Sequence, residues 1–335
     1  MIFGERPLAD CEGAILAHAL MLGKRHPKGS PVTPQLLAEA AAHGLATLWI
    51  ARAESGELPE AEAALRLAAS LAGPGTIARP PVHGRVNLHA AHDGLLLLDP
   101  AAIAAANGAS EGIGIATLGP YSPVAAGDLV ATIKIIPFNI PAGSIPAISA
   151  PIRVLPWSAA RRPALVQTRL PGTSAAMLAK TAAVTAERFA RLGVALHLLP
   201  PVDHGIAPLA AAIARLAAAS SRATGTDLLL IAGASATADR RDIVPMAIAA
   251  AGGQTLRLGM PVDPGNLLLL AQAADATPII GLPGCARSPK RNGFDLVLER
   301  LSAGLSVTPE TIAAMGAGGL LESGGHPTPW GWTAG

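Results

Sequence analysis

The stretch LLLIAGASATADRRDIVP, residues 228–245, decides the expected fold of this 335-residue sequence. Four apolar residues lead into a run of small ones, two carboxylates and two guanidiniums follow, and a helical pattern begins at residue 242. A short apolar run that ends in a polar loop and continues as a helix is typical of a buried strand in a parallel sheet. Ligands of such sheets bind beyond the carboxyl ends of the strands, which is where the loop at 233–242 falls.

The sequence from residue 163 onward repeats this alternation of strand and helix. It predicts an α/β domain over 163–305 with a mainly parallel sheet in three layers, because helices must cover both faces of fully apolar strands. The expected strands are 163–168, 194–200, 227–233, 254–260 and 277–284, and the expected helices are 174–192, 205–220, 242–251 and 288–303.

The sequence before residue 163 predicts a smaller α+β region that is rich in β. In the segment 1–75, Thr33 is a helix cap and Gly44 a helix stop. Short β-rich runs separated by Gly, Pro, Asn and Asp predict a small β unit over 76–140. The remaining segments are a Pro- and Ser-rich linker at 141–162 and a Gly-rich tail at 306–335.

Composition argues against several classes of protein. Half of the residues are hydrophobic and 14% are charged, so core material is plentiful. The net charge of +2, the 3% aromatic content and the lack of a Lys/Arg block argue against a nucleic-acid surface. No apolar run reaches the roughly 18–20 residues of a membrane span, and no signal peptide is visible. We therefore expect a cytoplasmic protein without a membrane or nucleic-acid partner.

The loop that begins at residue 233 has the composition of an oxyanion site. Its small residues, among them Gly233 and Ala234, let backbone amides come close to a ligand, and Ser235 and Thr237 can donate hydroxyl hydrogen bonds. The helix that follows adds unpaired N–H groups and partial positive charge. The loop therefore predicts a phosphate or similar oxyanion as ligand.

The charges that end this loop have two interpretations. Asp239 and Asp242 could hold Mg²⁺, which takes one or two carboxylates together with phosphate oxygens and water. Alternatively, Asp242 is a helix N-cap, and Asp239 and Arg241 belong to a solvated turn. Spacing alone leaves both interpretations open.

Two further turns follow in order after the same sheet. They are GMPVDPGNLLLL at 259–270 and PIIGLPGCARSPKRNGFD at 278–295, and each sets a Pro-Gly turn beside a strand. The second also brings four residues to the start of the helix expected at 288: Arg287, Ser288, Lys290 and Arg291. We expect these two segments and the loop at 233–242 to converge on one edge of the sheet.

In this order, the three segments resemble the molybdopterin-binding domain family, which includes molybdopterin adenylyltransferases, molybdopterin molybdenumtransferases and gephyrin. Gly233-Ala234 stand at the family's Gly pair, Arg241-Asp242 match the Arg-Asp of the adenylyltransferase branch, and Asp239 is similar to the first Asp of the other branch. Pro264-Gly265 and Gly281-Leu282-Pro283-Gly284 match two Pro-Gly turns of the molybdenumtransferase branch. The resemblance covers about 163–305, and the region ending in LVATIKIIPF is similar to stand-alone molybdopterin-binding proteins.

The resemblance implies a protein of molybdenum-cofactor biosynthesis or delivery. Its ligand would be molybdopterin or the adenylated form, and its candidate reactions would be molybdate insertion or adenylyl transfer. Asp239 and Asp242 would be the catalytic and Mg²⁺-binding residues, and the assembly a homo-oligomer with a molybdoenzyme client. The cofactor-binding residues implied are Gly233, Ala234, Ser235, Thr237, Arg241, Pro264, Gly265, Asn266, Gly284, Cys285, Arg287 and Ser288.

Several family charges are replaced in this chain. Asn266 replaces the family's turn lysine, and Cys285 replaces the Asn of the last turn. The segment QTRLPGT at 167–173 lacks the family's acidic residues. These departures favour two alternatives: a non-catalytic cofactor carrier or maturation chaperone for a molybdenum hydroxylase, or a nucleotide-pyrophosphate hydrolase on the same fold.

Three further sites have open interpretations. Cys285 is either a small buried filler or a thiolate whose pKa is lowered by the neighbouring Arg287 and Lys290. Asp203-His204 follow another strand, where the family often has an Asp at the same edge. His83, His89, His92 and Asp93 are metal-ligand types without metal-site spacing, which favours surface histidines.

Overall fold

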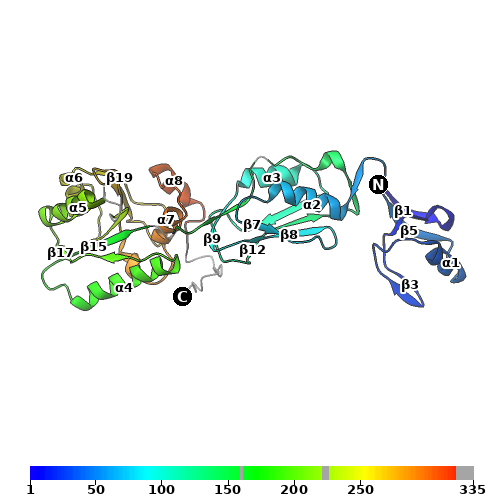
Figure 1. The fold of residues 1–335 in the computed structure, drawn as a ribbon, viewed down its shortest axis with the longest axis horizontal. Coiled ribbons are helices and arrows are strands. Elements are labelled where there is room, and N and C mark those ends of the chain that lie inside the picture. Colours follow the sequence, from blue (N-terminus) through cyan, green and yellow to red (C-terminus); the bar gives the residue numbers. More distant parts are fainter. Residues whose placement is uncertain (149, 159–160, 221–225, 322–335) are drawn as a thin grey trace. The chain divides into compact units, whose positions relative to one another are not determined.

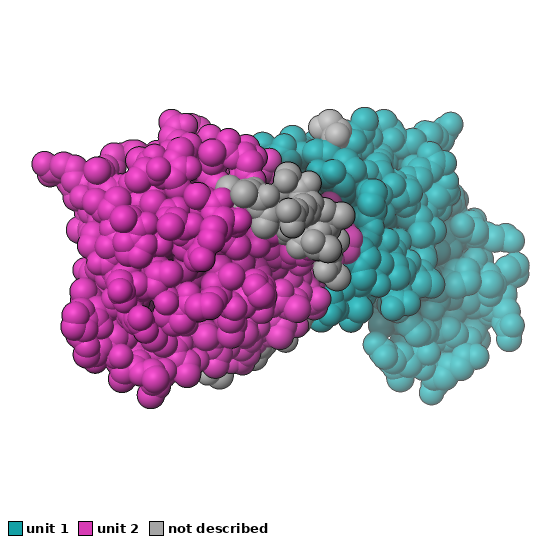
Figure 2. Space-filling model, turned by 60° about the vertical axis from the view of Figure 1, so that its left-hand side comes forward, with its two compact units in different colours: residues 1–154 teal, residues 155–335 magenta. Residues whose placement is uncertain are grey.

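The structure is a computed structural model that describes residues 1–148, 150–158, 161–220 and 226–321 (Figure 1). The chain divides into two compact units, Met1–Val154 and Leu155–Gly335, which are coloured separately in Figure 2. The described residues form a mixed α/β protein with eight α-helices and several sheets. Across these residues, no helix combines the length and the apolar character that a membrane span requires.

The first part of unit 1 is built from short antiparallel strands. β1 (Ile2–Pro7), β5 (Thr47–Arg52) and β2 (Ile15–Leu16) form a sheet in the order β1-β5-β2, and β3 (Leu20–Leu22) and β4 (Lys24–His26) form a hairpin. α1 (Pro34–Ala42) begins where the sequence predicts it, because the Thr33 side chain accepts a hydrogen bond from the N–H of Leu36.

The second part of unit 1 packs a helix on an antiparallel sheet. The sheet has the order β10 (Ile113–Thr117), β12 (Leu129–Ile135), β8 (Arg85–Ala90) and β7 (Thr76–Ala78). α2 (Glu60–Leu71) buries Leu67 and Leu71 in the same cluster as Leu88 and Ile133 of the sheet. The other elements are β6 (Glu57–Pro59) paired with β13 (Asn139–Pro141), β9 (Gly94–Leu97) between β11 (Pro123–Val124) and β14 (Arg153–Pro156), and α3 (Pro100–Gly108). The segment 141–162, expected as a linker, thus contains the paired strand β14.

Unit 2 contains a mixed sheet of seven strands. Its order is β16 (His197–Leu198), β15 (Pro163–Arg169), β18 (Leu228–Ala232), β21 (Pro278–Gly281), β20 (Leu269–Gln272) and β19 (Gln254–Leu258), and β17 (Val202–Asp203) also pairs with β15. The pairs made by β15 and the pair β18–β21 are parallel, whereas β20 is antiparallel to both of its neighbours. The sequence interpretation missed β20 because the apolar run LLLL at 267–270 follows a Pro-Gly turn so closely.

The two faces of this sheet pack into two different clusters. Leu165, Leu228 and Leu230 share a cluster with residues of α4 (Ala175–Arg191) and α7 (Gly293–Ser302). The alternate residues Ala164, Val166 and Leu229 share another cluster with α5 (Ile206–Ser220) and α6 (Ile243–Ala250). This alternation follows from the two-residue period of a strand and explains why the strands are apolar throughout.

The helix expected at 288–303 begins later than predicted. Asn292 caps α7, and the side chain of Asp295 accepts a hydrogen bond from the N–H of Asn292 to complete a capping box. Of the four residues expected at this helix start, Arg291 directly precedes the N-cap, whereas Arg287 and Ser288 lie several residues before it, so the prediction is wrong for those two. Short 3₁₀ helices lie at Leu8–Asp10, Ala142–Ser144, Gly284–Arg287 and Ala314–Gly316.

The segment after 305 packs on unit 2 as far as residue 321. α8 (Pro309–Ala313) buries Ile312 in the cluster of α4 and α7. Asp263 accepts a hydrogen bond from the N–H of Leu321 at 2.9 Å and donates its own N–H to Gly319 at 2.8 Å. The rest of the expected tail, 322–335, lies outside the described residues.

Candidate functional site

A pocket of about 200 Å³ lies in unit 2 where β18 and β21 end. These strands are parallel, with Ile231 opposite Gly281, so the loops that follow them leave the sheet at the same edge. The pocket is lined by Thr181, residues 232–236, residues 282–284, Ala286 and Arg287. Two of the three predicted loops therefore meet here.

The loop after β18 is fixed by close contacts of its backbone. A Cβ added to Gly233 would lie 2.9 Å from the carbonyl oxygen of Ser235, so a larger residue would displace the loop. The N–H of Ala234 donates to Thr168 Oγ1 at 2.7 Å, and this hydroxyl lies 2.8 Å from Nδ1 of His204. Within the described residues, the N–H groups of Ser235 and Ala236 donate no hydrogen bond. They are thus available to a ligand in the pocket.

Arg287 joins the two loops. Its Nη2 donates to the carbonyl oxygen of Gly233 at 2.6 Å, and the side chain lines the pocket. A guanidinium carries five N–H donors in a planar fork, which suits phosphate and carboxylate ligands. Arg287 therefore supplies positive charge beside the loop amides, which is the combination that an oxyanion requires.

A second arginine, Arg188 of α4, holds the loop that carries Arg287. Its Nε donates to Asp295 Oδ1 at 2.8 Å, and the two side chains are only 2% and 4% exposed. Its other donors reach backbone carbonyl oxygens of the loop, those of Ala286 at 2.9 Å, Ser288 at 2.6 Å and Lys290 at 3.0 Å. The loop is therefore wrapped around a buried guanidinium, which sets the position of Arg287.

A further buried pair lies in the same part of unit 2. Arg291 Nη2 donates to Glu299 Oε2 at 2.7 Å, and its Nη1 contacts Oε1. Burial raises the pKa of the Glu299 carboxyl, and the guanidinium of Arg291 opposes this shift. The pairing is what allows a carboxylate to be buried here.

Asp239 and Arg241 form an exposed pair outside the pocket lining. Arg241 donates to Asp239 Oδ1 through Nε at 2.7 Å and to Oδ2 through Nη2 at 3.1 Å. These side-chain hydrogen bonds lower the pKa of the Asp239 carboxyl below its usual range. The pair matches the solvated-turn interpretation.

Asp242 is the N-cap of α6. Its Oδ1 accepts from the N–H of Ile243 at 2.7 Å, and its Oδ2 accepts from the N–H of Ala238 at 3.4 Å. Both oxygens of Asp242 thus accept from backbone amides, and both oxygens of Asp239 accept from Arg241. Among the residues described, no group of three His, Cys, Asp or Glu side chains could hold a metal ion.

The third predicted loop, at 259–268, contacts the start of α7 and does not line the pocket. The carbonyl oxygen of Pro264 accepts from the N–H of Gly293 at 2.8 Å, and that of Asn266 accepts from the N–H of Met260 at 2.9 Å. Gly265 has a φ of +145°, and a Cβ there would lie 2.7 Å from the nitrogen of Gly293. This Pro-Gly turn is thus required for packing.

Four other predicted residues lie around the pocket in different environments. Ser235 and Gly284 line it, whereas Thr237 and Ser288 do not. Ser288 contributes its carbonyl oxygen to Arg188, and its hydroxyl accepts from the N–H of Lys290 at 3.3 Å.

Cys285 does not have the lowered pKa that its basic neighbours suggest. Burial raises the pKa of this half-buried thiol, and the nearby positive charge of Arg188 only partly opposes the effect. The raised pKa favours the interpretation of Cys285 as a small buried filler over that of an activated thiolate.

Sequence reasoning missed three residues that shape this site: Thr168, Thr181 and Arg188. Thr168 and Arg188 act on segments that lie 66 to 102 residues away in the sequence, so no local spacing reveals them. His204 was a candidate by its place after a strand, and it lies within hydrogen-bond distance of Thr168.

Comparison with protein-family models and with curated proteins finds no match to this chain. The likeness to the molybdopterin-binding family therefore depends on the sequence motifs quoted above.

Proposed function

We propose that unit 2 binds the phosphate group of molybdopterin in the pocket between the loops 233–236 and 282–287. The observation that carries this proposal is the position of the Arg287 guanidinium beside the unpaired amides of Ser235 and Ala236. Amide donors and a guanidinium around one small cavity are suited to a phosphate.

The size of the pocket supports a phosphate as the buried group. Its volume of about 200 Å³ is below the ~300–1,000 Å³ that a whole small-molecule ligand occupies. In this proposal, the phosphate enters the pocket and the pterin ring lies outside it. We also propose that this domain has the three-layer arrangement with a mainly parallel sheet that its alternating strands and helices predict.

The proposed role is binding and delivery of the cofactor to a molybdoenzyme. The contacts of Asp239 and Asp242 support this role over metal-assisted transfer, because Arg241 and backbone amides already occupy their oxygens. Adenylyl transfer and molybdate insertion are the competing functions, and they differ from delivery in that they consume a second substrate.

The test is calorimetric titration of molybdopterin into the wild type, Arg287→Ala and Lys180→Ala. Loss of a charge-assisted hydrogen bond of ~1.5–3 kcal/mol should weaken binding about tenfold or more in Arg287→Ala. Lys180 is an exposed cation of α4 outside the pocket lining, so its removal should leave the affinity unchanged.

Two outcomes would contradict the proposal. Equal affinity of wild type and Arg287→Ala would show that the phosphate does not bind in this pocket. Absence of binding to the wild type would show that molybdopterin is not the ligand. Turnover of molybdopterin with ATP, Mg²⁺ and molybdate would contradict the delivery role and support adenylyl transfer or molybdate insertion.

A further inference from the structure

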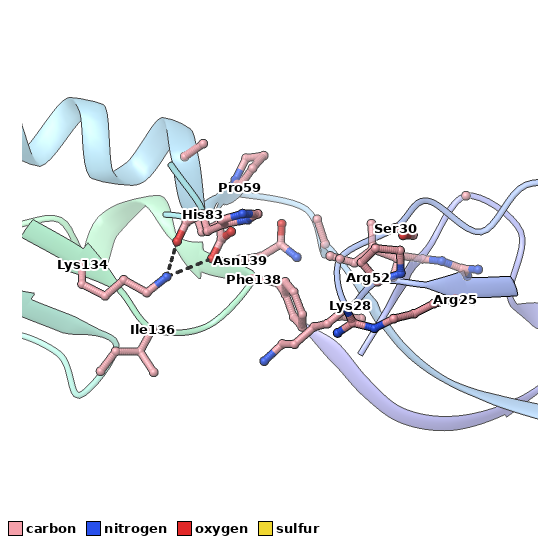
Figure 3. A pocket seen from close by; sticks show the side chains of 18 residues that line it. Arg25, Lys28, Ser30, Arg52, Pro59, His83, Lys134, Ile136, Phe138 and Asn139 are labelled. Atoms are coloured by element: carbon pink, nitrogen blue, oxygen red, sulfur yellow. Dashed lines mark hydrogen bonds and ion pairs between the residues drawn. The ribbon is translucent and has the colours of Figure 1, made fainter. Parts of the chain in front are cut away.

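Unit 1 contains a larger pocket of about 900 Å³ that is lined by apolar residues and several cationic side chains (Figure 3). Four cationic side chains line it: Arg25 of β4, Lys28 just after β4, Arg52 at the end of β5, and Lys134 of β12. Glu60 is the only carboxylate among the described residues that line it. The whole chain carries a net charge of only +2, so this pocket concentrates positive charge.

The cations of this pocket differ in how they are engaged. Lys134 lies 3.5 Å from Glu60 and also contacts the carbonyl oxygen of His83, and Arg52 donates to the carbonyl oxygen of Glu12 at 2.9 Å. Within the described residues, the side chains of Arg25 and Lys28 form no hydrogen bond or ion pair, and both residues are exposed. Their charges are thus available to an anionic ligand.

Apolar side chains accompany these charges. The ammonium of Lys28 lies 4.9 Å from the centroid of the Phe138 ring, and Ile136 lines the pocket with 63% of its surface exposed. An isolated inorganic anion would leave such surface unused, whereas an organic body attached to the anion would cover it.

One wall of the pocket is a strained turn. His83 has a φ of +47°, and Gly84 follows it with a φ of +67°. A Cβ at Gly84 would lie 2.6 Å from Glu60 Oε2, so a larger residue here would displace the carboxylate that pairs with Lys134. Strain of this kind persists where the surrounding structure fixes a particular arrangement, and binding sites are one such place.

We propose that this pocket binds a small organic phosphate with more than one negative charge, of the size of a nucleoside diphosphate. Several cations on different segments match several charges on the ligand, and the volume lies within the ~300–1,000 Å³ of small-molecule sites. A nucleic-acid surface is less well supported, because the cations line a cavity and the aromatic content of the chain is 3%.

The test uses ADP, pyrophosphate and adenosine as probes in calorimetric titrations of the full chain with EDTA present. We expect ADP to bind the wild type, pyrophosphate to bind more weakly and adenosine not to bind. The double variant Arg25→Ala/Lys28→Ala should weaken ADP binding at least about tenfold, and an increase in salt should weaken it in the wild type.

A matched double variant controls for charge. Lys24→Ala/Arg66→Ala removes two exposed cations of unit 1 that do not line the pocket, so ADP affinity should change less than about threefold. Thermal melting of both double variants checks that they fold, which is expected because Arg25 and Lys28 contribute no ion pair within the described chain.

The variant Arg287→Ala separates this proposal from the site in unit 2. ADP binding that persists in Arg287→Ala and falls in Arg25→Ala/Lys28→Ala supports the pocket of unit 1. Loss of ADP binding in Arg287→Ala alone, equal affinity in wild type and Arg25→Ala/Lys28→Ala, or no binding to the wild type would each overturn it.

Discussion

The two loops of unit 2 that were expected to carry the ligand hold their charges in opposite ways. The loop at 286–290 surrounds the guanidinium of Arg188, which is 2% exposed and bonded to Asp295. The loop at 237–242 keeps Asp239 and Arg241 together at the surface, with the Arg241 side chain 88% exposed. Water can replace a partner in the second loop but not in the first. The buried contacts therefore fix Arg287 in the pocket, whereas Asp239 and Arg241 lie at the surface outside the pocket lining.

Arg188→Ala tests the buried half of this comparison and should have the largest effect. It leaves Asp295 buried without its partner and removes donors from the carbonyl groups of the loop, so we expect a loss of about 3–5 kcal/mol in unfolding free energy. Urea unfolding measures this loss. Lys180→Ala on the same helix is the control, and its unfolding free energy should stay within ~0.5 kcal/mol of the wild type. A loss below about 1 kcal/mol for Arg188→Ala would show that the loop does not depend on this guanidinium.

The two Pro-Gly turns offer a second contrast. Gly265→Ala should cost about 1–3 kcal/mol, because φ is +145° and the new Cβ would lie 2.7 Å from the nitrogen of Gly293. Gly284→Ala should stay within ~0.5 kcal/mol, because the space around its Cβ position is open. Thermal melting of both variants tests this difference, and similar melting temperatures would contradict it.

Asp242→Ala tests the cap of α6. Loss of an N-cap costs about 0.5–2 kcal/mol, and Asp242→Asn should recover most of it because Asn also caps well. Denaturant unfolding of the two variants gives the comparison. If Asp242→Ala were as stable as the wild type but bound molybdopterin as weakly as Arg287→Ala, Asp242 would be a ligand-binding residue and not a cap.

The smallest expected effect is a shift in the pKa of the Asp239 carboxyl when its partner Arg241 is removed. Hydrogen bonds from Arg241 lower the folded pKa of Asp239, so the pair contributes stability above the unfolded pKa and loses it as the pH falls through the folded pKa. NMR of the side-chain carboxyl carbon should show the pKa of Asp239 rising towards about 3.9 in Arg241→Ala. Arg240→Ala is the matched control, because Arg240 donates to the carbonyl of Thr255 instead. An unchanged pKa in Arg241→Ala would exclude the pairing.

The sequence predicts local elements better than the contacts that assemble the site. α4, α5 and α6 lie within one or two residues of their expected bounds, since periodicity and capping are encoded locally. β20 and the true start of α7 depend on pairing and capping around Pro-Gly turns, which the apolar pattern does not resolve. Gly233, Ala234, Ser235, Gly284 and Arg287 were expected at the pocket and line it.

The remaining site contacts could not be predicted because they join distant segments. Arg188 and Asp295 are 107 residues apart, and Thr168 and Ala234 are 66 apart, so neither pair leaves a local pattern. Cys285 illustrates a further obstacle: neighbours in sequence suggested a lowered pKa, but the burial that raises it is known only from the fold.

The pairing of Asp263 with residues 319–321 has a practical consequence for fragment design. A recombinant fragment that ends at residue 305 would remove Ile312 and Met315 from the core of unit 2 and leave both backbone groups of Asp263 without their partners. The Pro-Gly turn that Asp263 precedes would then be open to proteolysis. An expression boundary for unit 2 should therefore lie beyond Leu321.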